Sequence, residues 1–449
     1  MIIEQFEDKE LSHYSYAILS ESKLVLIDPA RDTELYLSFA QRHKAQIVGV
    51  IETHPHADFI SSHLELQQST GAKIYCSGLL DSEYPSEPFD EGDSLTFGKI
   101  KLKAINTPGH SPDSICVVLE LDGRDKAVFT GDTLFIGDCG RPDLREKAGN
   151  IPAKREELAR QMYHSLRDKL MELDDTVVVY PSHGAGTLCG KSLSEASQST
   201  IGKEKATNWS LKEMSEEAFV KALTEDQPFI PNYFAFDVKL NKKGAIALHD
   251  SISAVEIGKA INSAEDTTRL DKKIIIIDTR SSEKFKDQHL PNSINIMAEG
   301  KFETWLGSIL LPEEPFFLAA ENSEVLNELL KRVAKIGYEL FIQEAFVLNF
   351  GEAKSAKIDL QAFRLQPENY TIVDIRNEKE ANDEPIFSSA INIPLPELRE
   401  RITEIPSEKP IAVHCAGGYR SAAGSSIIED HISTVAVYDL SKAINDFSK

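Results

Sequence analysis

Five apolar, β-rich runs precede residue 190, and each of them ends in a polar loop that carries His or Asp. The runs are KLVLIDPA, QIVGVIETHPHAD, IKLKAINTPGHSPD, KAVFTGDTLF and TVVVYPSHGAG. Short apolar runs that stop at polar, turn-forming residues predict strands. Because strands hold the ends of such loops rigidly while the loops vary, the loops at one edge of a sheet are a usual place for a functional site. We therefore expect the five loop ends to share one site.

Length and composition limit the class of protein. A chain of 449 residues exceeds what one hydrophobic core usually supports, which predicts roughly two to four domains. With 41% hydrophobic residues and no apolar run near the ~18 needed to span a bilayer, we expect a globular protein that is not in the membrane. The net charge of -23 disfavours nucleic acid and anionic lipid as partners.

Two further features bear on location. The opening MIIEQFEDKELSHY has neither the basic nor the apolar region of a secretory signal. The five cysteines contain no CxxC pair and are an odd number in a long chain, which argues against a disulfide framework. Together these features predict the reducing cytoplasm.

Beyond about residue 245 the chain repeats itself. The two copies are IIIIDTRSSEKFKDQHLPNSINI and YTIVDIRNEKEANDEPIFSSAINI, in which Asp278 and Arg280 fall on Asp374 and Arg376. A period near 96 residues indicates duplicated domains. Short apolar strands alternate with helical stretches in each copy, which predicts βαβ units and a small parallel sheet. The expected domains are residues 1–245, 246–357 and 358–449.

Side chains that bind divalent metals lie in four loops of the first domain. They are His54, His56 and Asp58 after one strand, and His110, Asp132 and His183 after later ones. Imidazole and carboxylate are ligands of iron, zinc and manganese. A single histidine at a strand end is usually structural, but four loops of matching type predict a metal site.

The motifs THPHAD, TPGHSPDS, GDTLF and YPSHGAG resemble those of the metallo-β-lactamase superfamily in order and spacing. The resemblance covers roughly residues 1–245 and implies an α/β fold, an αββα sandwich with the metal between the sheet edges. In the binuclear hydrolase branch, exemplified by glyoxalase II, the first motif reads HxHxDH, and its last histidine binds a second metal. Phe59 stands at that position and has no donor atom.

This departure implies a site for one metal, held by His54, His110 and Asp132. Two histidines and one carboxylate are the ligand set of non-haem Fe(II) oxygenases. The chain is thus similar to the persulfide dioxygenase branch, which oxidises a thiol-bound sulfane sulfur to sulfite with O2. GDCGRPD, residues 137–143, also resembles that branch. One Fe(II) per chain is the implied cofactor.

The same resemblance implies roles for six more residues. Arg141, Asp143 and Tyr180 would orient the thiol carrier and its terminal sulfur. The other three residues would form hydrogen bonds with ligands, water or substrate, or would bind a weak second metal. They are His56, Asp58 and His183.

The stretch AVHCAGGYRSAAGSS follows a short apolar strand and precedes a helical stretch. Cys415 would lie where main-chain N–H groups and a helix N-terminus converge, with Arg420 nearby, and such a cradle stabilises a thiolate. The loop closely resembles the active loop of rhodanese sulfurtransferases, which transfer sulfane sulfur through a cysteine persulfide. The other copy, FFLAAENSE, has Ala319 or Ala320 at the cysteine position, so we expect that domain to be degenerate.

Two sulfur modules on one chain predict an enzyme of sulfide detoxification. In this hypothesis Fe(II) oxidises a low-molecular-weight thiol persulfide with O2, and Cys415 exchanges sulfane sulfur with a thiol, sulfite or thiosulfate. One alternative is a binuclear zinc thioester hydrolase of the glyoxalase II type with a rhodanese appendage, and another is a sulfur-carrier scaffold with a vestigial metal site. The sequence does not identify the thiol that carries the sulfur. It also leaves the oligomeric state open, and a homo-oligomer is one of the options.

Overall fold

The structure is a computed structural model that describes residues 1–144 and 155–447. By its internal contacts the chain divides into two compact units, which we describe separately. The first comprises residues 1–250 with 335–337, and the second residues 251–334 with 338–449. Among the described residues, no helix is both long and apolar enough to cross a membrane.

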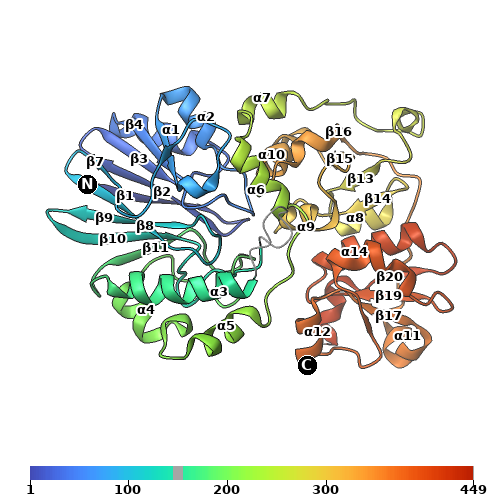
Figure 1. Ribbon diagram of the computed structural model, residues 1–449. Helices are drawn as coiled ribbons and strands as arrows, with labels where there is room; N and C mark the ends of the chain where they lie inside the picture. Colours follow the sequence, from blue (N-terminus) through green and yellow to red (C-terminus); the bar gives the residue numbers. More distant parts are fainter. Residues whose placement is uncertain (145–154, 448–449) are drawn as a thin grey trace. The chain divides into compact units, whose positions relative to one another are not determined.

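Two six-stranded sheets form the centre of the first unit (Figure 1). The first sheet contains, in spatial order, β1 (Ile2–Asp8), β2 (His13–Ser20), β3 (Lys23–Ile27), β4 (Gln46–Ile51), β5 (Lys73–Cys76) and β6 (Glu87–Pro88). The second contains β12 (Ser199–Thr200), β11 (Val178–Pro181), β10 (Arg124–Gly131), β9 (Ile115–Leu121), β8 (Ile100–Asn106) and β7 (Ser94–Phe97). Strand β4 runs parallel to β3, and β11 runs parallel to β10.

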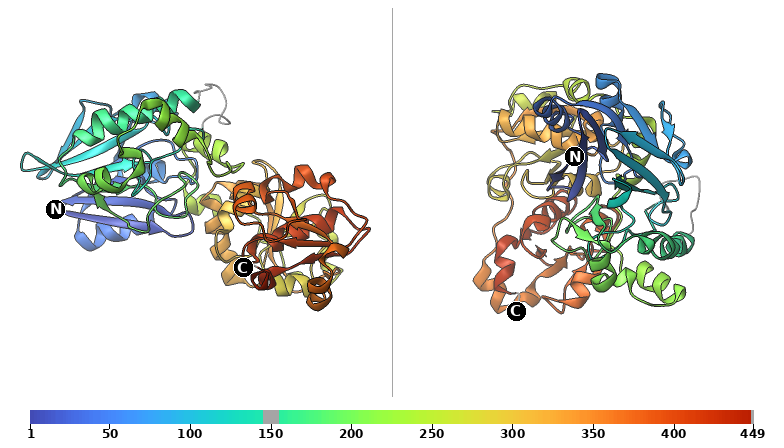
Figure 2. Two further views of the ribbon diagram at one scale, coloured as in Figure 1. Left: turned by 90° about the horizontal axis from the view of Figure 1, so that it is seen from below. Right: turned by 90° about the vertical axis from the view of Figure 1, so that its left-hand side faces the viewer.

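The two sheets pack face to face and are covered by helices on their outer faces, as Figures 1 and 2 show. Alternation along β3 explains this packing, because successive strand residues point to opposite faces. Leu24 and Leu26 pack with Tyr36 and Phe39 of a covering helix, while Val25 faces the apolar core between the sheets. Both faces of the sheet are therefore buried. The αββα sandwich expected from the sequence is confirmed.

The first three helices of the first unit connect its strands, and the other four follow its last strand in the sequence. They are α1 (Glu34–His43), α2 (His63–Thr70), α3 (Arg155–His164), α4 (Ile201–Thr207), α5 (Glu216–Thr224), α6 (Phe234–Lys243) and α7 (Leu248–Ser253), the last of which reaches into the second unit. Helix α1 covers the first sheet, and α3 and α5 cover the second through a separate apolar cluster.

The second unit contains two four-stranded parallel sheets with the same strand order. Their strands are β14 (Ser293–Asn295), β13 (Ile275–Asp278), β15 (Phe316–Ala320) and β16 (Ile342–Val347), and β18 (Ile391–Asn392), β17 (Thr371–Asp374), β19 (Ile411–His414) and β20 (Val437–Asp439). The helices are α8 (Ser282–Asp287), α9 (Phe302–Ile309), α10 (Ser323–Ala334), α11 (Leu360–Leu365), α12 (Glu378–Asp383), α13 (Leu398–Arg401) and α14 (Tyr419–His431). The common order confirms that the two repeats share a fold.

The register of the central strands aligns the two copies residue by residue. Asp278 pairs with Ala319 in the first sheet, and Asp374 pairs with His414 in the second. The next residue, Ala320, therefore takes the place of Cys415 in the first copy. Of the two alanines that the sequence offered, the strand pairing selects this one.

The two small domains pack against each other through α14, the helix that follows the cysteine loop. The main-chain N–H of Asn295 donates to the Ser426 hydroxyl at 3.0 Å, and that of Asn292 donates to Asp430 at 3.1 Å. On α13, the Arg399 guanidinium pairs with Glu314 at 2.7 Å. The copy without a cysteine thus supports the helix that carries the cysteine loop.

Candidate metal centre and cysteine loop

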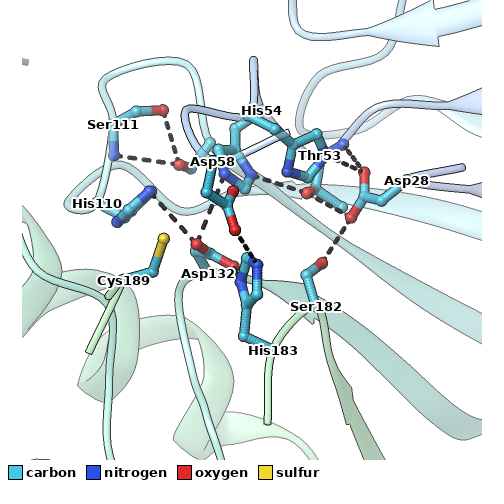
Figure 3. Close-up of polar contacts among 12 residues, drawn as sticks. Asp28, Thr53, His54, Asp58, His110, Ser111, Asp132, Ser182, His183 and Cys189 are labelled. Carbon is cyan, nitrogen blue, oxygen red and sulfur yellow. Dashed lines mark hydrogen bonds and ion pairs between the residues drawn. The ribbon is translucent and has the colours of Figure 1, made fainter. Parts of the chain in front are cut away.

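The predicted metal ligands converge where strands of both sheets end (Figure 3). His54 follows β4, Asp132 follows β10 directly, and His110 lies in the loop between β8 and β9. All three side chains are buried, with at most 3% of each exposed. One ligand atom from each lies within 4.8 Å of the other two, so the structure brings this predicted trio together.

The spacing of the trio fits a bound metal better than it fits hydrogen bonds. Asp132 Oδ2 lies 3.8 Å from His54 Nε2 and 3.5 Å from His110 Nε2. Two ligands about 2.1 Å from one metal lie roughly 3–3.5 Å apart, whereas hydrogen bonds are about 2.7–3.2 Å long. Asp132 Oδ2 is also buried without a hydrogen-bond partner, which is costly unless a cation binds there. The donors therefore suit one divalent metal.

The second nitrogen of each histidine is fixed by the chain. His110 Nδ1 donates to the main-chain oxygen of Arg141 at 2.9 Å. His54 Nδ1 lies 3.0 Å from the Thr53 hydroxyl, which in turn donates to Asp28. Because Nδ1 carries the proton in this arrangement, Nε2 of each ring faces Asp132 as an acceptor. Such outer hydrogen bonds orient metal-binding histidines and set their tautomer.

His183 bridges two carboxylates beside the trio. Its Nε2 lies 2.7 Å from Asp58 Oδ2 and its Nδ1 lies 2.8 Å from Asp132 Oδ1. Burial lowers the pKa of His183, but Asp132 and Asp58 outweigh burial and raise it to about 10. The pKa of Asp132 is held well below its usual range, since His183 overcomes the opposing effect of burial. A protonated His183 thus lies between the two carboxylates and balances part of their negative charge.

Cys189 lies next to this bridge and was not among the predicted site residues. Its sulfur, with ligand atoms of Asp58 and His183, forms a second group within 4.8 Å. Burial raises the pKa of the Cys189 thiol well above its usual value, and neighbouring Asp58 and Asp132 raise it further. The thiol is therefore neutral here. Its position in GAGTLCG, six residues after His183, was the signal available in the sequence.

His56 belongs to a separate polar group. Its Nε2 lies 3.2 Å from Asp28 and 3.4 Å from Glu52, and the structure does not place it with the trio. Burial lowers the pKa of His56, but these two carboxylates raise it well above its usual value. Sequence reasoning missed both acids, although Asp28 ends the run KLVLID and Glu52 directly follows VGVI.

Phe59 is buried between two histidine rings. Its ring centroid lies 3.9 Å from that of His13 and 4.3 Å from that of His56. Burial, together with the charges of His183 and His56, lowers the pKa of His13, so His13 is neutral. No spacing in the sequence marks His13, which is the first residue of a strand. Phe59 thus supplies an apolar surface where HxHxDH proteins supply a ligand.

The three residues predicted to orient the substrate lie in two different surroundings. Arg141 is 1% exposed and holds Asp143 through two hydrogen bonds of 2.7 and 2.8 Å, while its remaining nitrogen donates to Leu188 and Phe229 main-chain oxygens. Tyr180 stacks on Phe129 within the core between the sheets. Arg141 thus contributes to the centre through its carbonyl, which fixes His110. The substrate-orienting role of these residues stays a prediction.

The motif GDCGRPD is explained by close packing. A Cβ atom on Gly140 would lie 1.9 Å from the Asp132 carbonyl oxygen and 3.0 Å from His110 Nδ1, so only glycine fits. Asp138 accepts hydrogen bonds from the Trp209 indole at 2.7 Å and from the main-chain N–H groups of Lys191 and Ser192 at 2.9 and 2.8 Å. Through Asp138, the motif therefore fixes the position of the loop that contains Cys189.

The cysteine loop lies between β19 and α14 in the second unit. Cys415 Sγ accepts hydrogen bonds from the main-chain N–H groups of Gly418 at 3.1 Å and Ser421 at 3.4 Å. Gly418 has φ +98°, and a Cβ atom there would lie 2.9 Å from Ser441. The predicted cradle is present. Arg420, however, pairs with Glu380, and its guanidinium does not supply either of these hydrogen bonds.

Two family models match separate parts of the chain. The Metallo-beta-lactamase superfamily matches residues 8–183, and the Rhodanese-like domain matches residues 263–345 and 359–449. A metallo-beta-lactamase crystal structure from Staphylococcus aureus subsp. aureus COL is 32% identical, with a TM-score of 0.68. The match covers 77% of this chain and 99% of that one.

Two curated relatives differ in activity. The cytoplasmic hydroxyacylglutathione hydrolase of Arabidopsis thaliana is 34% identical over 38% of this chain, and the match spans 63% of that protein, less than two thirds. The mitochondrial persulfide dioxygenase ETHE1 of Bos taurus is 29% identical over 55% of this chain and 89% of its own length. The chain belongs to the metallo-beta-lactamase superfamily and carries two rhodanese-like domains, of which the second contains Cys415.

Proposed function

We propose that the chain is an Fe(II)-dependent persulfide dioxygenase fused to a sulfurtransferase that acts in sulfide detoxification. The observation that carries the proposal is that buried donor atoms of His54, His110 and Asp132 lie within 4.8 Å of one another, while Phe59 stands where the motif HxHxDH has a histidine. The overall reaction is RSSH + O2 + H2O giving RSH and sulfurous acid, which ionises to sulfite. The similarity to persulfide dioxygenase ETHE1 supports this assignment.

Two histidines and one carboxylate suit a single iron because they leave three neighbouring coordination positions for substrates. A ferrous ion bound there would supply the one-electron chemistry that O2 requires. The chain contributes orientation, since Arg141 O and Thr53 fix the two imidazoles. His183 forms a hydrogen bond with Oδ1 of Asp132, which leaves Oδ2 facing His54 and His110.

Sulfur transfer is assigned to Cys415. In this step the Cys415 thiolate attacks the outer sulfur of a persulfide, a new S–S bond forms, and the carrier leaves as its thiolate. The N–H groups of Gly418 and Ser421 point at Cys415 Sγ and stabilise negative charge there. Attack by sulfite on the outer sulfur then yields thiosulfate and regenerates the Cys415 thiolate. We place the protein in a reducing cytoplasm, where its five unpaired cysteines stay reduced.

Metal analysis of protein purified without oxygen, combined with oxygen uptake on glutathione persulfide, tests the dioxygenase assignment. About one iron per chain and persulfide-dependent oxygen uptake are expected. Glutathione persulfide that consumes no oxygen in the iron-loaded protein would contradict the proposal.

A binuclear thioester hydrolase is the second candidate. It is favoured by the group of Asp58, His183 and Cys189 beside the first trio, and by the similarity to a hydroxyacylglutathione hydrolase. Two zinc ions per chain with hydrolysis of S-lactoylglutathione would support this candidate instead. His183 argues against it, because both of its nitrogens already contact carboxylates.

A further inference from the structure

Arg420, five residues after the active-loop cysteine, is held by a carboxylate from another helix. Its two terminal nitrogens lie 2.6 and 2.8 Å from the two oxygens of Glu380 on α12. Glu380 also accepts a hydrogen bond from the main-chain N–H of Asn377 at 3.1 Å, which caps the start of that helix. A bidentate pair of this kind fixes both side chains and cancels their charges at short range.

The cysteine-less domain holds the same arginine from another direction. The guanidinium carbon of Arg420 lies 5.8 Å from the ring centroid of Trp305 on α9, within the range of a cation–π contact. The neighbouring Tyr419 hydroxyl donates to the main-chain oxygen of Met297 at 2.7 Å. Only 14% of the Arg420 side chain is exposed. The degenerate copy therefore helps to fix this part of the active loop.

The hydrogen bonds to the Cys415 sulfur come from the main chain. In the described part of the chain, Cys415 Sγ receives its hydrogen bonds from Gly418 and Ser421. The loop is open to solvent at Ala416 and Gly417, and a Cβ atom on Gly417 would meet nothing within 4 Å. A substrate that enters here meets main-chain N–H groups, while the Arg420 guanidinium is already paired with Glu380.

We propose that Glu380 is a specificity-determining residue of the Cys415 site. By pairing with Arg420 through both carboxylate oxygens, it cancels the positive charge that would otherwise attract anions to the loop. Dianionic thiosulfate is therefore a poor sulfur donor here, and persulfides with little charge beyond the sulfur are good ones. This inference rests on the proposed sulfurtransferase function of Cys415.

The test compares Glu380→Gln with Glu378→Gln, which removes the same charge from an exposed position on the same helix. Full-length protein is mixed with thiosulfate or with 2-mercaptoethanol persulfide without oxygen, and the rate of sulfur addition to Cys415 is followed by mass spectrometry. Glu380→Gln should raise the thiosulfate rate at least threefold and the persulfide rate less than twofold. Glu378→Gln should change neither rate.

A second measurement needs no sulfur transfer. Iodoacetate is an anion and iodoacetamide is neutral, so the ratio of their alkylation rates at Cys415 reports the free positive charge near the sulfur. We expect the ratio to rise at least threefold in Glu380→Gln, and to a smaller extent in Glu380→Asp, whose shorter side chain keeps the charge. If loss of the helix cap unfolds Glu380→Gln, the alkylation ratio of Glu380→Asp still tests the proposal.

The inference and the proposed function fail in different ways. If Cys415 takes sulfur from neither donor in the unmodified protein, the sulfurtransferase assignment is wrong, but the alkylation ratio still tests the role of Glu380. If the alkylation ratio and the thiosulfate rate of Glu380→Gln match those of Glu378→Gln in folded protein, Glu380 has no such role. If Glu380→Gln accelerates sulfur transfer equally from thiosulfate and from the persulfide, the specificity role of Glu380 is also wrong.

Discussion

The ring of Phe59 lies against the ring of His13, with the two centroids 3.9 Å apart. His13 comes from the first sheet and Phe59 from the loop that supplies His54, so this contact joins the metal centre to β2. Phe59 is 1% exposed and has no donor atom. A position that could hold a metal ligand therefore holds an apolar ring between two imidazoles.

Replacing Phe59 with histidine should raise the metal content. The new imidazole would stand next to Asp58, in the arrangement HxHxDH that binds a second metal. In zinc-rich medium we expect Phe59→His to bind up to two metals per chain, measured by mass spectrometry of total metal, and to lose oxygen uptake. Phe59→Leu is the matched control and should keep one metal. Two metals in the unmodified protein would contradict this explanation of Phe59.

Removing a ligand of the trio should abolish oxygen uptake. Asp132→Ala or His110→Ala leaves two protein ligands, and we expect a loss greater than the roughly 10–100-fold that loss of an outer hydrogen-bond partner costs. Asp125→Ala, at the other end of β10, is the control. Sulfur transfer through Cys415 should persist, because that residue lies in the other unit. Oxygen uptake at normal iron content in either variant would refute the ligand assignment.

Asp143→Asn tests whether Arg141 stabilises the fold. Both partners are buried, and removing one charge from a buried pair costs about 3 kcal/mol or more. For a unit of this size that cost predicts a melting temperature roughly 6–12 °C lower, measured by calorimetry. A normal melting temperature with a raised KM for persulfide would instead support the substrate-orienting role predicted from the sequence.

The ion pair between Asp143 and Arg141 also predicts that the stability of the fold depends on pH. Burial raises the pKa of Asp143, but Arg141 outweighs burial and lowers it below its usual value. A carboxylate with a lowered pKa stabilises the fold above its unfolded pKa, about 3.9, and this contribution is lost as the pH falls further. The stability difference between the unmodified protein and Asp143→Asn should therefore be full at pH 6 and should shrink below pH 4. A difference that stays constant into acid would exclude ionic pairing as its cause.

The strand-end pattern predicted a shared metal site, and the family resemblance selected His54, His110 and Asp132 within it, which the structure brings together. The sequence did not predict where His56 points, since two histidines two residues apart in a loop need not face one metal. The partner of His56, Asp28, is 28 residues away and becomes its neighbour only when β3 and β4 pair in parallel. Contacts of this kind depend on tertiary packing, which local spacing does not encode.

In the cysteine loop, too, the local structure could be predicted from the sequence, while the long-range contacts could not. Its glycines and its position between a strand and a helix were sufficient to predict the cradle around Cys415. The pairing of Arg420 with Glu380 was not predictable, because Glu380 precedes Arg420 by 40 residues. The guanidinium that was expected to favour the thiolate is instead held by a carboxylate. The choice of Ala320 over Ala319 likewise required the strand register.

Cys415→Ser should eliminate sulfur transfer and leave oxygen uptake on preformed persulfide near normal. A serine hydroxyl ionises too weakly to attack sulfur and cannot form a persulfide. The other four cysteines are buried in the first unit, and burial raises the thiol pKa of each of them, so none is expected to replace Cys415. After a thiosulfate or persulfide pulse, mass spectrometry should find the added sulfur on the Cys415 peptide alone. Sulfur on Cys139 or Cys189, with transfer intact in Cys415→Ser, would refute the assignment.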